Sequence, residues 1–430
     1  MQTAFIASAE QNIEINQHIK ISGSQLIKAN SAPNTQTTAA PGIMESATVT
    51  DQRREETVCC GIGKYSAKIQ IGTDPRNVFS VTYFVPENGE WQSKATDAFV
   101  ILNGQFLTAA TLADTPTDDS FAIYIAEKEN KNVFIVGRRE DSVRPGDDLG
   151  FMINITPETY KFDTYLAVLF AKMQTMSFHP GVSMNNINVT LLGYSMGGVQ
   201  STLYLESDYN RVLSYRGNVQ KHIPVEIAIK FDPKKNKLAE TQKNRYAALK
   251  QKWDSGIYHN DEMLVILYAS SLAATDPNSA SAIMPGLTNI EAWRMLMSKT
   301  YQFDAYPSTP HFHYISGNKN RLLKVDEQRV LNASLTAVPY SALSMDIFVA
   351  GMQGNIDGYD IDAGKINIKT LCIGVGGGFG SNACHWFKNE VGKNANVTFI
   401  EWGHSGHAGW LFDKNAKQLW DKIIAWDTKN

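Results

Sequence analysis

A serine between two glycines favours nucleophilic chemistry in this chain. The pattern is Gly193-Tyr194-Ser195-Met196-Gly197; an apolar run over residues 188–192 precedes it, and a helical stretch follows. A tight turn from strand to helix pushes a serine hydroxyl out above a sheet, and the glycines let neighbouring backbone pass close by. We therefore predict that Ser195 is a nucleophile.

Ser195 needs a base, because a serine hydroxyl is a weak nucleophile at neutral pH. Two of the nine histidines, His404 and His407, follow the last apolar segment of the chain, residues 396–402. Either imidazole could accept the proton of the serine.

The C-terminal segment provides a resemblance to a known family. An aromatic residue at Trp410, Ala416 nine residues after His407, and a closing helix with Trp420 and Ile423 resemble the C-terminus of the acid-lipase-like branch of the α/β-hydrolase superfamily. The resemblance covers roughly residues 60–232 and 366–430. It implies an α/β-hydrolase fold, a serine hydrolase activity, and His407 as the catalytic histidine, with His404 second.

The same resemblance implies an oxyanion hole made of backbone N–H groups, which stabilise the charge of a tetrahedral intermediate. One donor would be Met196, directly after the nucleophile. The other would lie in the turn after the third strand, where many relatives have His-Gly and this chain has Asn103-Gly104-Gln105-Phe106. Gln105 is the candidate there, with Phe106 second.

The catalytic acid departs from the usual pattern. In most enzymes of this fold an Asp follows the seventh strand, but residues 371–382 contain no carboxylate. Some enzymes take the acid from the end of the sixth strand instead. We expect that strand over residues 225–231, so Asp232 becomes the candidate, although Asp before Pro233 also starts turns. Three other carboxylates, or no acid at all, remain open: Asp357, Asp360 and Glu401.

Cofactor motifs are weak. The glycine-rich run of residues 374–380 matches a nucleotide-binding pattern only with relaxed spacing, and it lacks the Lys-Ser/Thr pair of a phosphate-binding loop. The cysteines, Cys59, Cys60, Cys372 and Cys384, do not have zinc-site spacing. We therefore expect no organic cofactor and no metal.

The elements that must position these residues alternate between strand and helix. We expect antiparallel strands at 64–71 and 78–85, then strands at 98–102, 132–137, 188–192, 225–231, 368–375 and 396–402. Helices are expected at 120–129, 157–176, 383–391 and 415–426. This alternation predicts an α/β fold with a mostly parallel sheet and helices on both faces.

Four regions follow from this pattern. Residues 1–57 are rich in Ser, Thr, Ala, Gln and Asn, which predicts a loosely ordered arm. Residues 58–232 form the first part of the core and 366–430 the second. Between them, over 233–365, the alternation breaks down, and we expect a cap or lid inserted over the site.

Composition limits the partners and the compartment. With 43% hydrophobic residues and a net charge of −3, the chain is globular and has no field that would gather nucleic acid or an anionic membrane. We find no apolar run of membrane-spanning length, and the pattern of the first residues leads us to expect no secretory signal. Four cysteines are too few and too irregular for a disulfide framework, so we expect free thiols and a cytoplasmic location.

Together these observations predict a serine hydrolase that cleaves an ester or thioester of a small to medium acyl substrate through an acyl-enzyme. An acyltransferase on the same fold would use the same residues. The missing acid leaves open a third class, a tailoring or binding protein with a repurposed triad.

Overall fold

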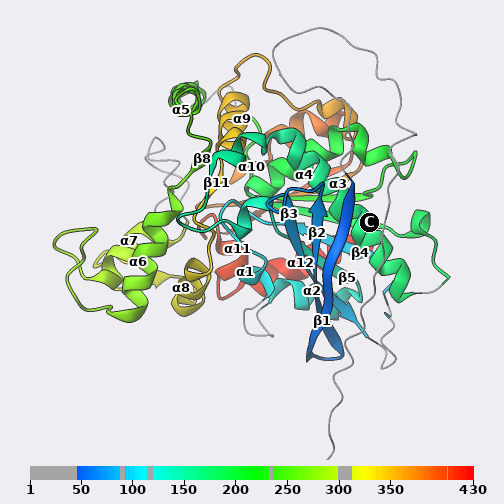
Figure 1. The fold of residues 1–430 in the computed structure, drawn as a ribbon, viewed down its shortest axis with the longest axis horizontal. Coiled ribbons are helices and arrows are strands. Elements are labelled where there is room, and N and C mark those ends of the chain that lie inside the picture. The colour runs from blue at the N-terminus through cyan, green and yellow to red at the C-terminus, as the bar shows by residue number, and fades with distance from the viewer. Residues whose placement is uncertain are drawn as a thin grey trace, which may run out of the picture.

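The computed structural model describes residues 46–87, 93, 95–113, 120–179, 181–231, 236–298, 312–403 and 405–430. A nine-stranded sheet runs through the molecule (Figure 1). In spatial order its strands are β1 (Ala47–Cys59), β2 (Ile62–Ile71), β3 (Val78–Pro86), β5 (Asn132–Val136), β4 (Ala98–Leu102), β6 (Val189–Tyr194), β7 (Lys221–Val225), β12 (Lys369–Val375) and β13 (Val397–Trp402).

The predicted mixture of antiparallel and parallel pairing is confirmed. Strands β1, β2, β3 and β5 pair antiparallel, whereas β5, β4, β6, β7, β12 and β13 are parallel. Every residue of β4, β5 and β6 is buried. Strands covered by helices on both faces are apolar throughout, which explains why their sequences do not alternate.

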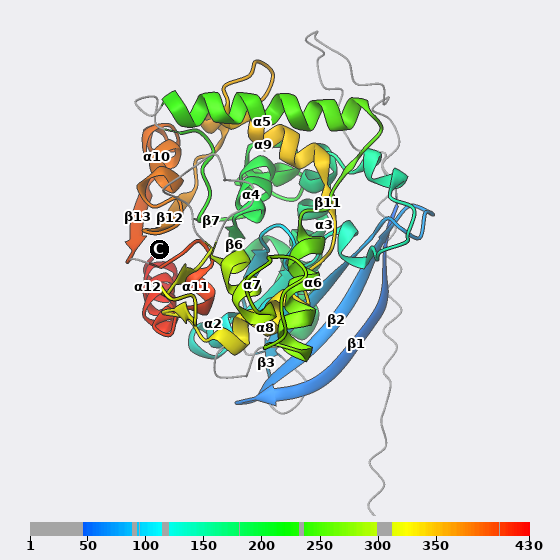
Figure 2. The ribbon, with the colours of Figure 1, turned by 90° about the vertical axis from the view of Figure 1, so that its left-hand side faces the viewer.

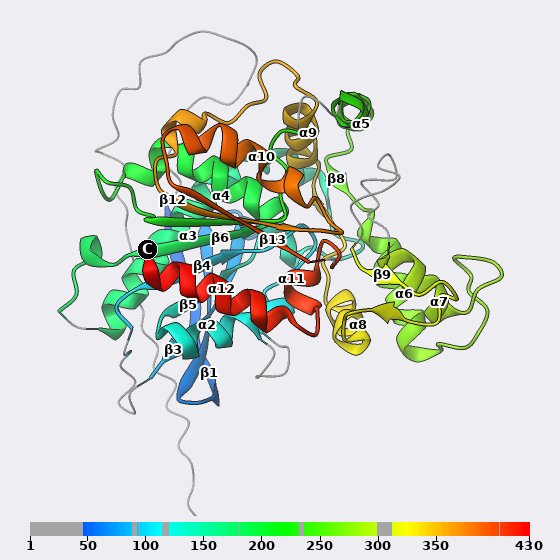
Figure 3. The same ribbon diagram turned by 180° about the vertical axis from the view of Figure 1, so that it is seen from behind.

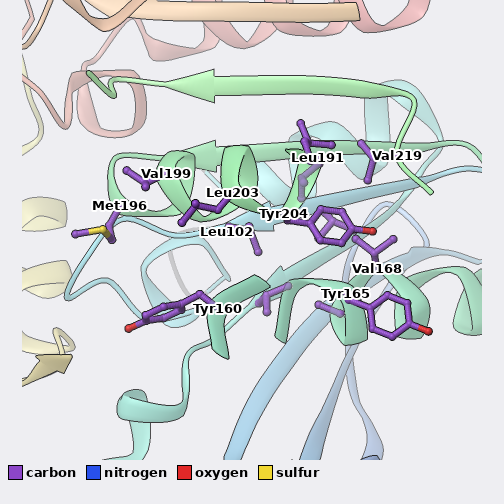
Figure 4. Close-up of a cluster of buried hydrophobic side chains, with 14 of the residues drawn as sticks. Leu102, Tyr160, Tyr165, Val168, Leu191, Met196, Val199, Leu203, Tyr204 and Val219 are labelled. Atoms are coloured by element: carbon purple, nitrogen blue, oxygen red, sulfur yellow. The ribbon is translucent and has the colours of Figure 1, made fainter. Parts of the chain in front are cut away.

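Helices cover the two faces of the sheet (Figures 1 and 3). On one face lie α3 (Pro157–Phe178), α4 (Met196–Glu206) and α10 (Ser381–Asn389); α2 (Phe121–Glu129), α12 (Ala416–Lys429) and the short α1 (Ala110–Ala113) and α11 (Gly409–Phe412) lie on the other. Figure 4 shows part of the hydrophobic core on the face covered by α3 and α4. There Leu102 and Leu191 of the sheet meet Val168 of α3 and Leu203 of α4. The core therefore fixes α4, and with it the turn before that helix.

The expected loose arm is wrong for residues 47–57, which form most of β1. Partly exposed and exposed side chains make up most of this strand, and its pairing with β2 is interrupted by register shifts. An edge strand has one free side, and charged side chains protect it from pairing with other chains. The alternation of apolar residues that marks a strand in sequence is therefore absent here.

The expected strand over residues 225–231 is also wrong, because β7 ends at Val225. Glu226 has a positive φ of 50°, and the following segment leaves the sheet. Ile227, Ala228 and Ile229 are apolar because they are buried in the core beneath α4, not because they extend the strand. Burial without strand pairing produced the same sequence signal.

Most of the helices in the segment between β7 and β12 lie outside the sheet layers (Figures 1 and 2). They are α5 (Asn236–Asp254), α6 (Met263–Thr275), α7 (Asn289–Met297), α8 (Glu327–Leu335) and α9 (Leu343–Gln353). Two small ladders join the segment, β8 (His259–Asn260) with β11 (Ser341–Ala342), and β9 (Tyr314–Ile315) with β10 (Leu322–Leu323). No helix among the described residues is long and apolar enough to cross a membrane.

Candidate active site

The turn that carries Ser195 has the geometry predicted for a nucleophile. Ser195 joins β6 to α4 with φ 52° and ψ −121°, a conformation that a residue with a side chain rarely adopts. A Cβ atom added at Gly193 would overlap the carbonyl oxygen of Gly197, and one added at Gly197 would overlap that of Leu102. Both glycines are therefore required by close backbone approach.

A histidine and a carboxylate meet beside this turn. The Nδ1 atom of His407 lies 2.9 Å from Oε2 of Glu226, and both side chains are buried. The imidazole packs against Tyr194, the residue before Ser195, with ring centroids 5.1 Å apart. Ser195, His407 and Glu226 line the same pocket, so the structure brings together a hydroxyl, an imidazole and a carboxylate, the three groups that a serine–histidine–acid triad requires.

The carboxylate of Glu226 is held by backbone donors. Oε1 accepts from the N–H of Val375 at 2.5 Å, and Oε2 from the N–H of Phe379 at 2.9 Å. A Cβ atom added at Gly378 would overlap Oε2. The glycine-rich run after β12 therefore wraps around a carboxylate and supplies two of its hydrogen-bond donors.

Asp232 lies outside the described residues, as does His404. The carboxylate that faces His407 belongs to Glu226. Glu226 was not among the predicted acids because it was expected inside the strand over residues 225–231. The other candidates, Asp357, Asp360 and Glu401, are exposed, and Asp360 pairs with Lys230 at 2.8 Å. One signal could have identified Glu226: it is an acidic residue at the point where an apolar strand meets the catalytic edge of the sheet.

The turn predicted to complete the oxyanion hole lies directly against Ser195. A Cβ atom added at Gly104 would be 3.3 Å from Cβ of Ser195. Gln105 and Met196 both line the pocket. Met196 is the first residue of α4, so its N–H is among those that a helix leaves without an intrahelical acceptor.

Arg138 orients the peptide group of Gln105. Its Nη1 atom donates to the carbonyl of Gly104 at 2.8 Å, and its Nη2 atom donates to the carbonyl of Asn103. In a trans peptide the C=O and N–H groups point in opposite directions. The N–H of Gln105 therefore points away from the guanidinium group of Arg138.

The pocket combines an apolar wall with a few polar groups. Its apolar lining comes from the sheet side and from the inserted helices: Phe106, Leu107, Val199, Ile227, Met263, Ile266, Met297, Val349, Phe379 and Phe412. His313 also lines it, and burial, together with the nearby His407, lowers the pKa of His313 to about 3. His313 is therefore neutral at physiological pH. The described residues contain no cluster of potential metal ligands.

A disulfide bond flanks the loop that holds Glu226. Cys372 of β12 and Cys384 of α10 are bonded, with their Cα atoms 5.7 Å apart. The expectation of four free thiols is therefore wrong for this pair. Two irregularly spaced cysteines gave no sequence signal because the fold, not their spacing, brings them together. The cytoplasmic location stays a prediction that thiol content no longer favours.

Comparisons with known proteins identify the fold. No family model matches the sequence, and no curated protein has a significantly similar sequence. A putative lipase from Sulfolobus solfataricus matches the structure with a TM-score of 0.58 at 15% identity, over 88% of this chain and 99% of the lipase. A thermostable carboxyl esterase from Bacillus coagulans matches with a TM-score of 0.50 at 11% identity, over 86% and 99%.

The chain has the α/β-hydrolase fold, with a mostly parallel central sheet covered by helices on both faces. The predicted fold class is thus confirmed. At these identities the matches establish the fold, and membership of the acid-lipase-like branch stays a prediction.

Proposed function

We propose that the protein is a serine hydrolase with the catalytic triad Ser195, His407 and Glu226. Ser195 attacks an acyl carbon while His407 takes its proton, and Glu226 holds the tautomer of His407 and stabilises the imidazolium. The alcohol or thiol leaves with that proton, and water then hydrolyses the acyl-enzyme. The observation that carries this proposal is the buried contact of 2.9 Å between His407 and Glu226 in the pocket of Ser195.

The N–H groups of Met196 and Gln105 are the proposed oxyanion donors. The bonds from Arg138 to the carbonyls of residues 103 and 104 support this role, because they fix a peptide plane before the reaction begins, and preorganised donors contribute most to catalysis of acyl transfer.

The proposed substrate is an ester or thioester with a small to medium acyl group. The pocket encloses about 120 Å³, comparable with the ~150 Å³ cavity that holds one benzene molecule. Its apolar lining suits an acyl chain. The matching solved structures bear the names of a lipase and a carboxyl esterase, which agrees with this substrate class.

A fluorophosphonate probe tests the nucleophile. We expect the intact protein to be labelled once and Ser195→Ala to lose all labelling. Ser201→Ala is the matched control, because Ser201 is a buried serine of α4, the helix that Ser195 precedes, and labelling should persist in it. Labelling of the Ser195→Ala variant at the wild-type rate would remove the proposal.

Acyl transfer to an alcohol or amine is the nearest rival, since it would use the same residues. Product analysis with and without an added acceptor alcohol separates the two reactions. The third class, a protein with a repurposed triad, was suggested by the lack of a carboxylate in residues 371–382. The contact between Glu226 and His407 argues against this class.

A further inference from the structure

The turn that carries Gln105 is attached to two parts of the molecule. Arg138 binds the carbonyl of Gly104 from the side of the sheet. On the other side, the N–H of Val338 donates to the carbonyl of Phe106 at 2.9 Å, and Val338 belongs to the segment between β7 and β12. This inserted segment therefore contacts the turn that is proposed to supply an oxyanion donor.

The side chain of Gln105 ends at a buried carboxylate of the same segment. Its Nε2 atom lies 3.0 Å from Oδ2 of Asp346 on α9 and 2.6 Å from Oγ of Ser341 in β11. A carboxylate can only accept, so the amide nitrogen of Gln105 faces Asp346. The Asp346 residue is 0% exposed. A hydrogen bond to a buried carboxylate is stronger than one between neutral groups at the surface.

Asp346 gathers donors from three different parts of the chain. Nη2 of Arg245 on α5 donates to Oδ1 at 3.0 Å, and Nδ2 of Asn260 in β8 donates to Oδ2 at 2.9 Å. Gln105 is the third donor. Replacing a buried ion pair with apolar side chains often leaves a protein equally stable or more stable. Stability alone therefore does not require a carboxylate here, whereas fixing the side chain of Gln105 does.

The backbone of the turn requires such support. Phe106 has a positive φ of 66°, and a residue with a side chain keeps this conformation only where its surroundings hold it. Arg138 fixes the peptide group before Gln105, while Asp346 and Val338 hold Gln105 and Phe106 from the other side. The N–H of Gln105 is therefore aligned by contacts on both sides.

We propose that Asp346 is a positioning residue for the oxyanion donor Gln105, so that the inserted segment takes part in catalysis as well as lining the pocket. This inference rests on the proposed hydrolase function and adds a residue to it. Misplacing a group by about 1 Å can cost about 10²-fold in rate. The loss falls on the transition state, because the negative charge develops only there. Loosening the contact should therefore lower kcat and leave KM nearly unchanged.

Two variants break the contact from opposite ends. Asp346→Asn replaces an acceptor oxygen with an NH₂ group. Gln105→Met removes the donating amide but keeps both the backbone N–H and the pair of Asp346 with Arg245. In hydrolysis of a p-nitrophenyl ester, we expect each variant to lower kcat at least about tenfold, with KM within about threefold of wild type. The double variant should lose little more than the stronger single variant, because both changes break one contact.

Asp163→Asn is the matched control. Asp163 is also a buried aspartate paired with an arginine, Arg139 at 2.6 Å, but it lies on α3 and does not line the pocket. This variant should keep kcat within about threefold of wild type. The melting temperature shows whether each variant folds. If Asp346→Asn does not fold, Gln105→Met decides alone, because it leaves the buried ion pair intact.

Hydrogen exchange tests the same contact without any need for activity. The N–H groups of Leu107 and Val338 donate to carbonyls of the turn at 3.2 and 2.9 Å, so their exchange reports on its opening. Mass spectrometry of peptides spanning residues 103–108 and 336–340 measures it. Both variants of the contact should speed this exchange at least about tenfold, and the control should leave it unchanged.

Three results would overturn the inference. They are a folded Gln105→Met protein that keeps kcat within about threefold of wild type, an effect on KM in place of kcat, and exchange at the turn that stays at the wild-type rate. A wild-type protein that cleaves no ester and takes up no fluorophosphonate would instead refute the proposed function. The exchange rates would then still decide whether Asp346 holds the turn.

Discussion

Replacing Glu226 with Gln tests the catalytic unit most directly, because the side chain keeps its size and loses its charge. All three groups that approach the carboxylate are donors: the N–H groups of Val375 and Phe379, and Nδ1 of His407. A carboxylate has two acceptor oxygens for them, whereas an amide has one and presents its NH₂ group to the others. Glu226→Gln should therefore disturb the tautomer of His407 as well as remove the charge.

The size of the effect follows from the geometry. Nδ1 and Oε2 are 2.9 Å apart, so the centres of the two charges lie about 4 Å apart, where an effective dielectric constant of about 20 gives about 4 kcal/mol. At about 1.4 kcal/mol for each factor of ten, losing this stabilisation of the imidazolium lowers kcat about 10³-fold. The tautomer effect adds to this, whereas KM should change little.

The assay is steady-state hydrolysis of a p-nitrophenyl ester, with the melting temperature as a check on folding. Glu140→Gln is the matched control: Glu140 is another fully buried glutamate, and it bonds Tyr160 away from the pocket. Adding Glu226→Gln to His407→Ala should cost little more than His407→Ala alone, because the residues act as one unit. A folded Glu226→Gln protein that keeps kcat within tenfold of wild type would refute the reasoning.

Other parts of the structure give three more predictions. Gly378→Ala should lower kcat by at least about 10²-fold, because the new methyl group overlaps Glu226. Gly392→Ala is the control and should leave kcat unchanged, because the nearest atom to its new methyl group is 3.6 Å away. Equal activities of the two variants would contradict this prediction. The denatured, unreduced protein should react with two equivalents of a thiol reagent, since two of four cysteines form the Cys372–Cys384 bond; four equivalents would show that the bond is absent. Burial lowers the pKa of His222 to about 3, so below about pH 6.5 only the unfolded state takes up a proton at this residue. As the pH is lowered further, His222 should therefore reduce the free energy of unfolding by about 1.4 kcal/mol per pH unit. His222→Gln should remove that contribution from the slope measured in denaturant titrations between about pH 6 and 4, and an unchanged slope would contradict the prediction.

Sequence patterns identified the strands that are buried on both faces and the turn whose backbone geometry requires glycine. Buried parallel strands such as β4 and β6 carry continuous apolar runs, and the turn at Ser195 carries glycines that its geometry requires. The patterns failed where burial and strand pairing do not coincide. The edge strand β1 pairs without being buried, and Ile227 to Ile229 are buried without pairing. A single misplaced strand end was enough to move the predicted acid away from Glu226.

The absence of an acid after β12 and the glycine run in the same loop are two aspects of one arrangement. Glu226 enters from the neighbouring strand, and the loop after β12 supplies N–H donors in place of a carboxylate of its own. A Cβ atom at Gly378 would occupy the space of the Glu226 carboxylate, so the loop can accept the acid only if it remains small at this point. No local pattern could reveal this, because donor and acceptor are about 150 residues apart in the chain and meet only once β7 and β12 pair. In other chains of this fold, a carboxylate after the strand that corresponds to β7 should therefore occur together with a glycine-rich loop without carboxylates after the strand that corresponds to β12.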